Sequence, residues 1–295
     1  MIVYPHAKIN LGLRIKGKRG DGFHEIETVI YPVEELCDIL EIKPSQAPQL
    51  SLYGLSVGGA LEDNLCMKAY NMLQVDFGLP PVQLHLCKQI PVGSGLGGGS
   101  SDGAYTLRLL NDYFSLGMNE LDLEKYAARL GSDCPAMLYK RPALATGRGE
   151  QISPIPLDLS GFHIAVYKPD FFISTAQAYA MAEAHRTTSS RCESLGTTPL
   201  HCESLGTTSS QQARSTPQHP CSLHEALSQP ISTWKECVVN DFEAVLFLEY
   251  PILKKYKEEL YASGAVYASL SGSGSALYGI FDSKEQSKRA IKSLC

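Results

Sequence analysis

The amino-acid sequence predicts a two-domain protein of the mixed α/β (α+β) class. Its 295 residues suit two domains of ordinary size. Segments that alternate like strands are interleaved with segments of helical periodicity. The proline-containing stretch SPIPLDLSG, at 153–161, is typical of a change of domain. We therefore expect one domain over residues 1–155 and a second over residues 156–295.

The composition excludes several classes of protein. The net charge is −5 and the pI is about 5.9. Nucleic-acid-binding proteins usually carry a basic face, so we expect no nucleic-acid partner. We expect no membrane span and no signal peptide, because no apolar run of about 18 residues and no charged leader occurs. The nine cysteines include no Cys-x-x-Cys pair and no zinc spacing, which favours free thiols in a reducing cytoplasm.

The opening segment KINLGLRI, at 8–15, alternates between apolar and polar residues. This pattern predicts a half-buried strand, with Lys8 and Asn10 side by side on the face away from the core. Further strands are expected at 26–33, 36–42, 82–87, 162–168, 265–270 and 276–281.

Helical spacing follows from residue 104 to 114 and again over 119–131, where Asn119 is a candidate N-cap and Gly131 a candidate end. Other helices are expected at 174–185, 223–229, 234–248 and 284–294. The segment 186–222 is rich in Ser, Thr, Gln and Pro and contains CESLGTT twice, at 192–198 and 202–208. We expect a mobile insertion there, since it buries too little apolar surface to order itself, and a partner-binding role is the alternative.

The stretch PVGSGLGGGSSDGA, at 91–104, joins a predicted strand to a predicted helix. Backbone N–H groups at a helix start lack partners and attract anions, and glycines let the backbone approach phosphate oxygens closely. Ser100 and Ser101 are expected at the N-cap. The stretch has no Walker A lysine and lacks the βαβ context of a dinucleotide fingerprint. A phosphate site therefore needs a lysine from elsewhere, with Lys8 and Lys88 as candidates; a flexible linker is the alternative.

Three motifs in order resemble those of the GHMP kinase superfamily: PHAKINLGL at 5–13, the glycine stretch at 91–104, and SLSGSGSALYGIF at 269–281. Further similarity to the branch that acts on a CDP-linked polyol lies in GDGFHEIET, EDNL, GSDCP and NDFE, at 20–28, 62–65, 131–135 and 240–243. The resemblance spans about residues 4–290, apart from the insertion. It implies a first domain like ribosomal protein S5 domain 2, a ferredoxin-like second domain, and an active site in the cleft between them.

The resemblance also implies an activity. The expected reaction is ATP-dependent phosphorylation of the 2-hydroxyl of 4-diphosphocytidyl-2-C-methyl-D-erythritol (CDP-methylerythritol), in the non-mevalonate (MEP) route to isoprenoid precursors, with Mg²⁺ accompanying ATP. A monomer or weak homodimer is expected. One alternative is a superfamily kinase for mevalonate, homoserine or a sugar, which the GDGFHE loop disfavours. Another is a nucleotide-binding regulator without turnover, which the presence of Lys8, Asn10 and Asp133 disfavours.

The resemblance assigns roles to particular residues. Asp133 would accept the hydroxyl proton, and Lys8 would bridge Asp133 and the γ-phosphate. Without the motifs, Asp133 is as well explained as a helix cap or surface acid, and Lys8 as a solvated strand lysine. The residues expected to bind the CDP-linked substrate are Asn10 at the polyol, Phe23 and Tyr179 on the two faces of the cytosine, His24 at its edge, and Thr175 nearby.

The residues expected around ATP are Asn64, Lys88, Pro91, Gly93, Gly95, Leu96, Gly97, Gly98, Gly99, Ser100, Ser101, Gly272 and Gly274. Ser101 is the candidate ligand for Mg²⁺. Three positions depart from the family pattern: Ser94 replaces a common glycine, Phe23 replaces tyrosine, and Asp102 replaces asparagine or a small residue. The carboxylate of Asp102 would weaken ATP binding unless it turns away to cap or to form an ion pair.

Overall fold

The computed structural model describes residues 1–194, 219 and 221–294. Most of the predicted insertion, including the second CESLGTT copy, lies outside the described residues. The strands are β1 (Ile2–Val3), β2 (His6–Lys18), β3 (His24–Cys37), β4 (Ile39–Pro44), β5 (Gln49–Gly54), β6 (Val82–Lys88), β7 (Ala143–Gly147), β8 (Gln151–Pro154), β9 (His163–Tyr167), β10 (Tyr267–Leu270) and β11 (Leu277–Phe281).

Helical segments connect and cover these strands. They are η1 (Leu61–Asp63), α1 (Leu65–Phe77), α2 (Gly98–Phe114), α3 (Glu120–Leu130), α4 (Cys134–Met137), α5 (Thr175–Ser194), α6 (Leu223–Leu227), η2 (Ile231–Thr233), α7 (Trp234–Cys237), α8 (Glu243–Glu249), α9 (Pro251–Ala262) and α10 (Lys284–Leu294). None of the helices within the described ranges is long and apolar enough to cross a membrane.

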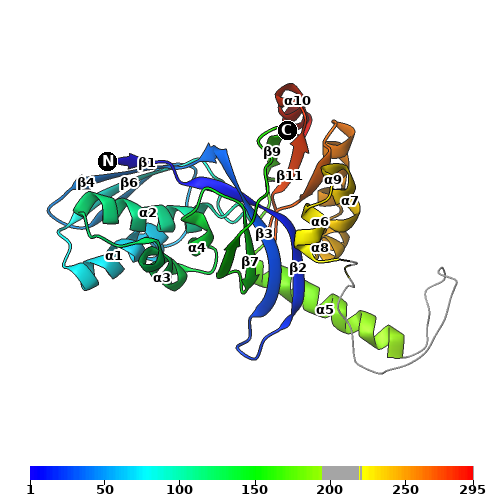
Figure 1. The fold of residues 1–295 in the computed structure, drawn as a ribbon, viewed down its shortest axis with the longest axis horizontal. Helices are drawn as coiled ribbons and strands as arrows, with labels where there is room; N and C mark the ends of the chain where they lie inside the picture. The colour runs from blue at the N-terminus through cyan, green and yellow to red at the C-terminus, as the bar shows by residue number, and fades with distance from the viewer. Residues whose placement is uncertain (195–218, 220, 295) are drawn as a thin grey trace.

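The strands of the described chain form three sheets, with orders β1-β4-β6-β5, β2-β3-β7-β8 and β10-β11-β9. All neighbours are antiparallel except β5 and β6. Figure 1 shows the long β2–β3 ribbon in the middle, with α1–α4 and the first sheet on one side and α6–α10 on the other. The ribbon therefore borders both halves of the molecule.

Strand β2 is buried on both faces, so the prediction of a half-buried strand is wrong. Ile9 and Leu11 pack in a cluster with Trp234 and Tyr278 from the second half of the chain. The opposite face, which carries Lys8 and Asn10, is covered as well, and each of these residues is only 3% exposed. The alternating pattern could not reveal this, because segments far away in the sequence supply the cover.

Helix α2 begins at Gly98, before the predicted N-cap at Ser100 and Ser101 and before the apolar helical spacing that starts at residue 104. Its N-cap is Gly97, at φ +69°, with no side-chain cap. Ser100 and Ser101 therefore lie inside the first turn, and their predicted position at the N-cap is wrong. The second predicted helix is confirmed as α3, where Asn119 Oδ1 accepts a hydrogen bond from Asp122 N and Gly131 is the C-cap.

Two further helix predictions need correction. The predicted helix over 234–248 is two helices, α7 and α8, because residues 238–241 leave the helix to pair with β2: Leu13 N donates to Val239 O and Asp241 N donates to Leu13 O. Helix α5 runs to Ser194 rather than 185, and the guanidinium of Arg186 binds the carbonyl of Ile15 beyond the predicted end. Helix α9 was not predicted, and the strands expected at 26–33 and 36–42 are the single long β3 followed by β4.

Candidate active site

The fold brings Lys8 of β2 and Asp133, just before α4, to the same place. Lys8 Nζ lies 3.6 Å from Asp133 Oδ2 and donates a hydrogen bond to Asn10 Oδ1. Asn10 Nδ2 in turn donates to Thr28 Oγ1 at 3.0 Å. Burial lowers the pKa of Lys8, and the neighbouring Asp133 carboxylate opposes this effect. The lysine is thus fixed by its neighbours, whereas the Asp133 side chain remains 37% exposed.

The Lys8–Asp133 pair lines a cavity of about 710 Å³. This first cavity is also lined by the predicted substrate-binding residues Asn10, Phe23, His24, Thr175 and Tyr179, and by Arg148, Ser273, Gly95, Gly97 and Gly272. Residues from both halves of the chain therefore meet around one space. Such a cavity is large enough for a ligand of nucleotide size.

Two contacts involve the aromatic residues that are predicted to bind the base. The ring of His24 stacks on Tyr179 with centroids 4.3 Å apart, and His24 Nε2 lies 2.8 Å from Glu183 Oε1. Phe23 is 54% exposed, and the guanidinium of Arg148 lies over its ring at 4.7 Å. The ring stacked on Tyr179 is thus His24, and a sandwich of a base between Phe23 and Tyr179 stays a prediction.

Sequence reasoning did not select Arg148 or Thr28. The sequence offered one signal for Arg148, its position between Gly147 and Gly149, but strand β7 before it was not predicted. Thr28 offered no signal, because its role as the partner of Asn10 depends on the register of β2 against β3.

The glycine stretch lies between β2 and a second glycine loop, residues 271–275, which follows β10. Lys8 N donates to Leu96 O at 2.9 Å, so β2 holds the stretch directly. Gly95 has φ +81°, and a Cβ there would lie 2.1 Å from Ser271 O. Both a left-handed conformation and close backbone contact therefore require glycine at position 95.

A second cavity, of about 420 Å³, lies along the glycine stretch. Among the residues predicted to bind ATP, those lining it are Asn64, Lys88, Pro91, Gly93, Gly95, Gly97, Gly98, Gly99 and Ser100. Leu96 is instead buried in the core, Gly272 lines the first cavity, and Ser101 and Gly274 line neither. Thr175 lines both cavities, which places them next to each other.

Lys88 is part of a buried ionic cluster. Its ammonium donates to Asp38 Oδ2 and, at 2.6 Å, to Asp102 Oδ2. Asp102, which departs from the family pattern, pairs with Lys88 in this cluster. An ion pair is one of the two arrangements that were expected for it. Burial and the nearby Asp38 raise the pKa of Asp102 to about 8, although Lys88 opposes them. The positive charge of Lys88 is thus already compensated within this cluster, whereas Lys8 faces the first cavity.

These features define a class of protein. Two α/β halves enclose adjoining cavities, a glycine-rich turn opens helix α2, and a lysine–carboxylate pair stands beside that turn. This arrangement is that of a small-molecule kinase in which backbone amides at a helix start hold the phosphates.

Comparison with known proteins gives the particular family. The model "GHMP kinases N terminal domain" matches residues 64–141, and "GHMP kinases C terminal" matches residues 223–295. The 4-diphosphocytidyl-2-C-methyl-D-erythritol kinase of Bacteroides thetaiotaomicron is 45% identical over 96% of this chain and 92% of its own length. The enzyme of that name from Porphyromonas gingivalis is 42% identical over 100% of this chain and 97% of its own length.

Solved structures agree with this result. A crystal structure of 4-(cytidine 5'-diphospho)-2C-methyl-D-erythritol kinase has a TM-score of 0.75 at 29% identity, covering 100% of this chain and 95% of that one. A homoserine kinase from Cytophaga hutchinsonii, at 15% identity and a TM-score of 0.64 over 98% and 89% of the two chains, shares the fold alone. The chain belongs to the GHMP kinases and, within them, to the family of 4-diphosphocytidyl-2-C-methyl-D-erythritol kinases. The predicted fold class and the resemblance are thereby confirmed.

Proposed function

We propose that this chain transfers the γ-phosphoryl group of ATP to the 2-hydroxyl of CDP-methylerythritol, in the MEP route to isoprenoid precursors. The observation that carries the proposal is the Lys8–Asp133 pair, 3.6 Å apart in a cavity that also presents Phe23 and His24. The pair suits transfer to a hydroxyl, and the aromatic residues suit a substrate that ends in a base. The family relationship supports the same reaction.

In the proposed mechanism, Asp133 accepts the proton of the 2-hydroxyl. The oxygen of this hydroxyl bonds to the γ-phosphorus of ATP, and the bond from the γ-phosphorus to the oxygen bridging to the β-phosphate breaks. Lys8, held by Asn10, places its ammonium between Asp133 and the transferring group. It favours the ionised carboxylate before transfer and offsets the negative charge that develops during transfer. The amides of the glycine stretch bind the phosphates that remain on ADP.

The second cavity is the proposed site for ATP. Asn64 lines this cavity while its Oδ1 accepts a hydrogen bond from Cys66 N at 2.9 Å, so its position is fixed by the start of α1. The hydroxyl of Ser101 is buried in the first turn of α2 without a hydrogen-bond partner in the described structure. Because Ser101 lines neither cavity, its hydroxyl does not face the proposed ATP site, and a magnesium ion carried by ATP would be held by the phosphates, whose charge it would neutralise.

The protein is proposed to act in the cytoplasm, as a monomer or weak homodimer. Within the described residues, no group of three His, Cys, Asp or Glu side chains is suited to hold a metal ion by itself. The proposal therefore assigns any magnesium to the nucleotide and not to a resident metal centre.

A panel of acceptor substrates tests this function. ADP release is measured in a coupled assay with CDP-methylerythritol, mevalonate, homoserine and galactose, and ³¹P NMR identifies the product. The expected result is turnover with CDP-methylerythritol and little with the others. Faster turnover with another acceptor would assign a different substrate. ATP binding without turnover on any acceptor would support the regulator alternative.

A further inference from the structure

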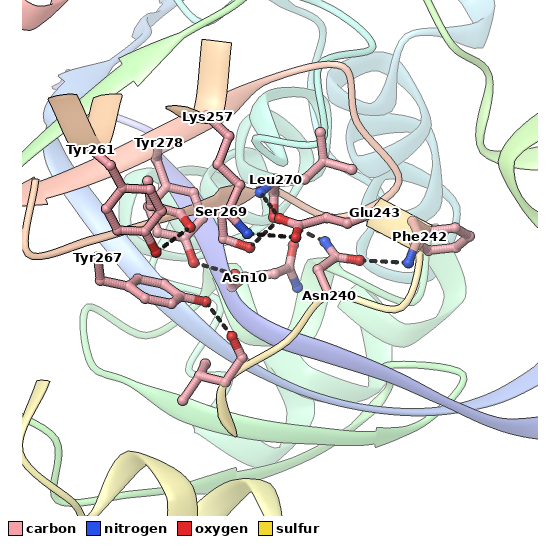
Figure 2. Close-up of polar contacts among 12 residues, drawn as sticks. Asn10, Asn240, Phe242, Glu243, Lys257, Tyr261, Tyr267, Ser269, Leu270 and Tyr278 are labelled. Atoms are coloured by element: carbon pink, nitrogen blue, oxygen red, sulfur yellow. Dashed lines mark hydrogen bonds and ion pairs between the residues drawn. The ribbon is translucent and has the colours of Figure 1, made fainter. Parts of the chain in front are cut away.

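The motif NDFE, at 240–243, stands out in the sequence, yet the proposed mechanism gives it no role. Asn240 lies between α7 and α8 and is fully buried. Its Nδ2 donates to the carbonyls of Leu270 and Gly272, both at 2.9 Å, and its Oδ1 accepts from Phe242 N at 3.0 Å. Figure 2 shows the Asn240 side chain between Leu270 and the backbone of Phe242. These three hydrogen bonds of the Asn240 side chain are thus all made to backbone atoms.

Glu243, the first residue of α8, binds the same stretch of chain. Its Oε1 accepts from Ser269 Oγ at 2.8 Å and from Leu270 N at 2.9 Å, and its Oε2 accepts from Lys257 Nζ at 2.6 Å (Figure 2). A buried carboxylate is tolerated where it is paired and hydrogen-bonded in this way. Asn240 and Glu243 therefore form hydrogen bonds with the end of β10 and with the start of the loop 271–275.

The loop 271–275 touches both parts of the proposed transfer site. Ser271 Oγ donates to Gly95 O at 2.9 Å, which fastens the loop to the glycine stretch. A Cβ on Gly272 would lie 3.2 Å from Asn10 Oδ1, so the loop backbone also packs on the residue that holds Lys8. In addition, Tyr278 OH, on β11 after the loop, donates to Asn10 O at 2.8 Å.

We infer that Asn240 and Glu243 are positioning residues for phosphoryl transfer, which fix the loop 271–275 against Gly95 and Asn10. Neither residue lines the first or the second cavity, so each acts through the loop and not by touching a substrate. The inference rests on the proposed function, because it assigns these residues to the same reaction. In this view the NDFE motif contributes to the geometry of the transfer site as well as to the stability of the fold.

The experiment compares Asn240→Asp with Tyr70→Phe. The first variant keeps the shape of the side chain but places an oxygen, in the position of Nδ2, against two carbonyls. The second removes a hydrogen bond outside this network, from Tyr70 OH on α1 to Pro80 O at 3.3 Å, and Tyr70 lines neither cavity. We expect both variants to lose thermal stability. We expect only Asn240→Asp to lose kcat, by about 100-fold, because small displacements of reacting groups have effects of that size.

Glu243→Gln is the milder second variant, since its amide oxygen still accepts from Leu270 N. We expect kcat to fall about tenfold while the dissociation constant for ATP changes little. All variants are assayed well below their unfolding midpoints. A kcat of Asn240→Asp and Glu243→Gln equal to that of Tyr70→Phe would overturn the inference. Absence of wild-type turnover on CDP-methylerythritol would instead contradict the proposed function, so the two failures are distinguishable.

Discussion

Lys8 Nζ lies 3.6 Å from Asp133 Oδ2, although one residue comes from the opening strand and the other from the start of α4. The two side chains differ in access: the lysine is 4% exposed and the carboxylate 37% exposed. The cation is therefore held in a fixed place, while the carboxylate can meet a hydroxyl in the cavity. This difference suits a lysine that stabilises charge and an aspartate that accepts a proton.

The lowered pKa of Lys8 predicts an alkaline limit to activity. Burial is the main cause of the shift, so the ammonium loses its proton below the ordinary value of 10.5. We expect kcat/KM, which reports the groups of the free enzyme, to fall as pH rises through the lowered pKa. The contribution of Lys8 to the free energy of unfolding changes in the opposite direction. It rises with pH between the two values, because the unfolded state binds more protons there.

The measurement is the pH profile of kcat/KM, with the thermal midpoint recorded at each pH. Loss of kcat/KM while the protein stays folded is the expected result. A kcat/KM that stays constant beyond pH 10.5 would show that a charged Lys8 is not required.

Phe23 is predicted to stack on the cytosine of the substrate. Because its ring is 54% exposed, Phe23→Ala should leave stability nearly unchanged. We expect the KM for CDP-methylerythritol to rise about 10- to 100-fold, from the loss of one base-stacking contact, with the KM for ATP unchanged. Phe23→Tyr should retain affinity because it keeps the ring.

Steady-state kinetics with each substrate varied in turn provide the check. Phe77→Ala is the matched control, as that ring is 42% exposed on α1 and lines neither cavity. An unchanged KM for the CDP-linked substrate in Phe23→Ala would remove Phe23 from the site.

Gly95 is predicted to admit no side chain. A Cβ would lie 2.1 Å from Ser271 O in a left-handed backbone conformation, so Gly95→Ala must displace one of the two glycine loops. We expect kcat to fall by about 100-fold or more, as for the loss of a preorganised backbone donor. Gly161→Ala is the control, since its Cβ would meet no atom within 4 Å. Wild-type kcat and ATP affinity in Gly95→Ala would contradict the proposed fit between the loops.

Lys88 is predicted to stabilise the fold through its ion pairs with Asp38 and Asp102. Lys88→Met leaves Asp38 and Asp102 buried without their cation, which should lower the free energy of unfolding by about 3–5 kcal/mol. The exposed pair of Lys140 and Glu34 offers a control: Lys140→Met should cost about 0–1 kcal/mol. Urea denaturation measures both. Reduced ATP affinity at unchanged stability would show that Lys88 serves the nucleotide and not the cluster.

Local patterns in the sequence predicted the elements that form through local interactions. Helix α3 with its Asn119 cap, strand β6, and the final helix α10 follow from periodicity and capping residues. The motifs also identified residues that lie close together in the fold. These residues, which all line one cavity, are Lys8, Asn10, Phe23, His24, Asp133 and Tyr179.

Features that depend on distant segments could not be predicted in this way. The buried second face of β2, the break between α7 and α8, and the pairing of Lys88 with Asp38 all arise from tertiary contacts. Periodicity reports which face of a segment is apolar, but it does not report which other segment covers a polar face.

Single-turnover phosphoryl transfer by Asp133→Asn tests the central claim most directly. Enzyme in excess is mixed with γ-labelled ATP and CDP-methylerythritol, and Asp112→Asn, an exposed acid on α2, serves as the control. The amide cannot accept the hydroxyl proton, so we expect the transfer rate to fall about 10²- to 10⁴-fold with ATP affinity retained. Transfer at the wild-type rate would contradict the account, because proton acceptance would then not depend on the carboxylate beside Lys8.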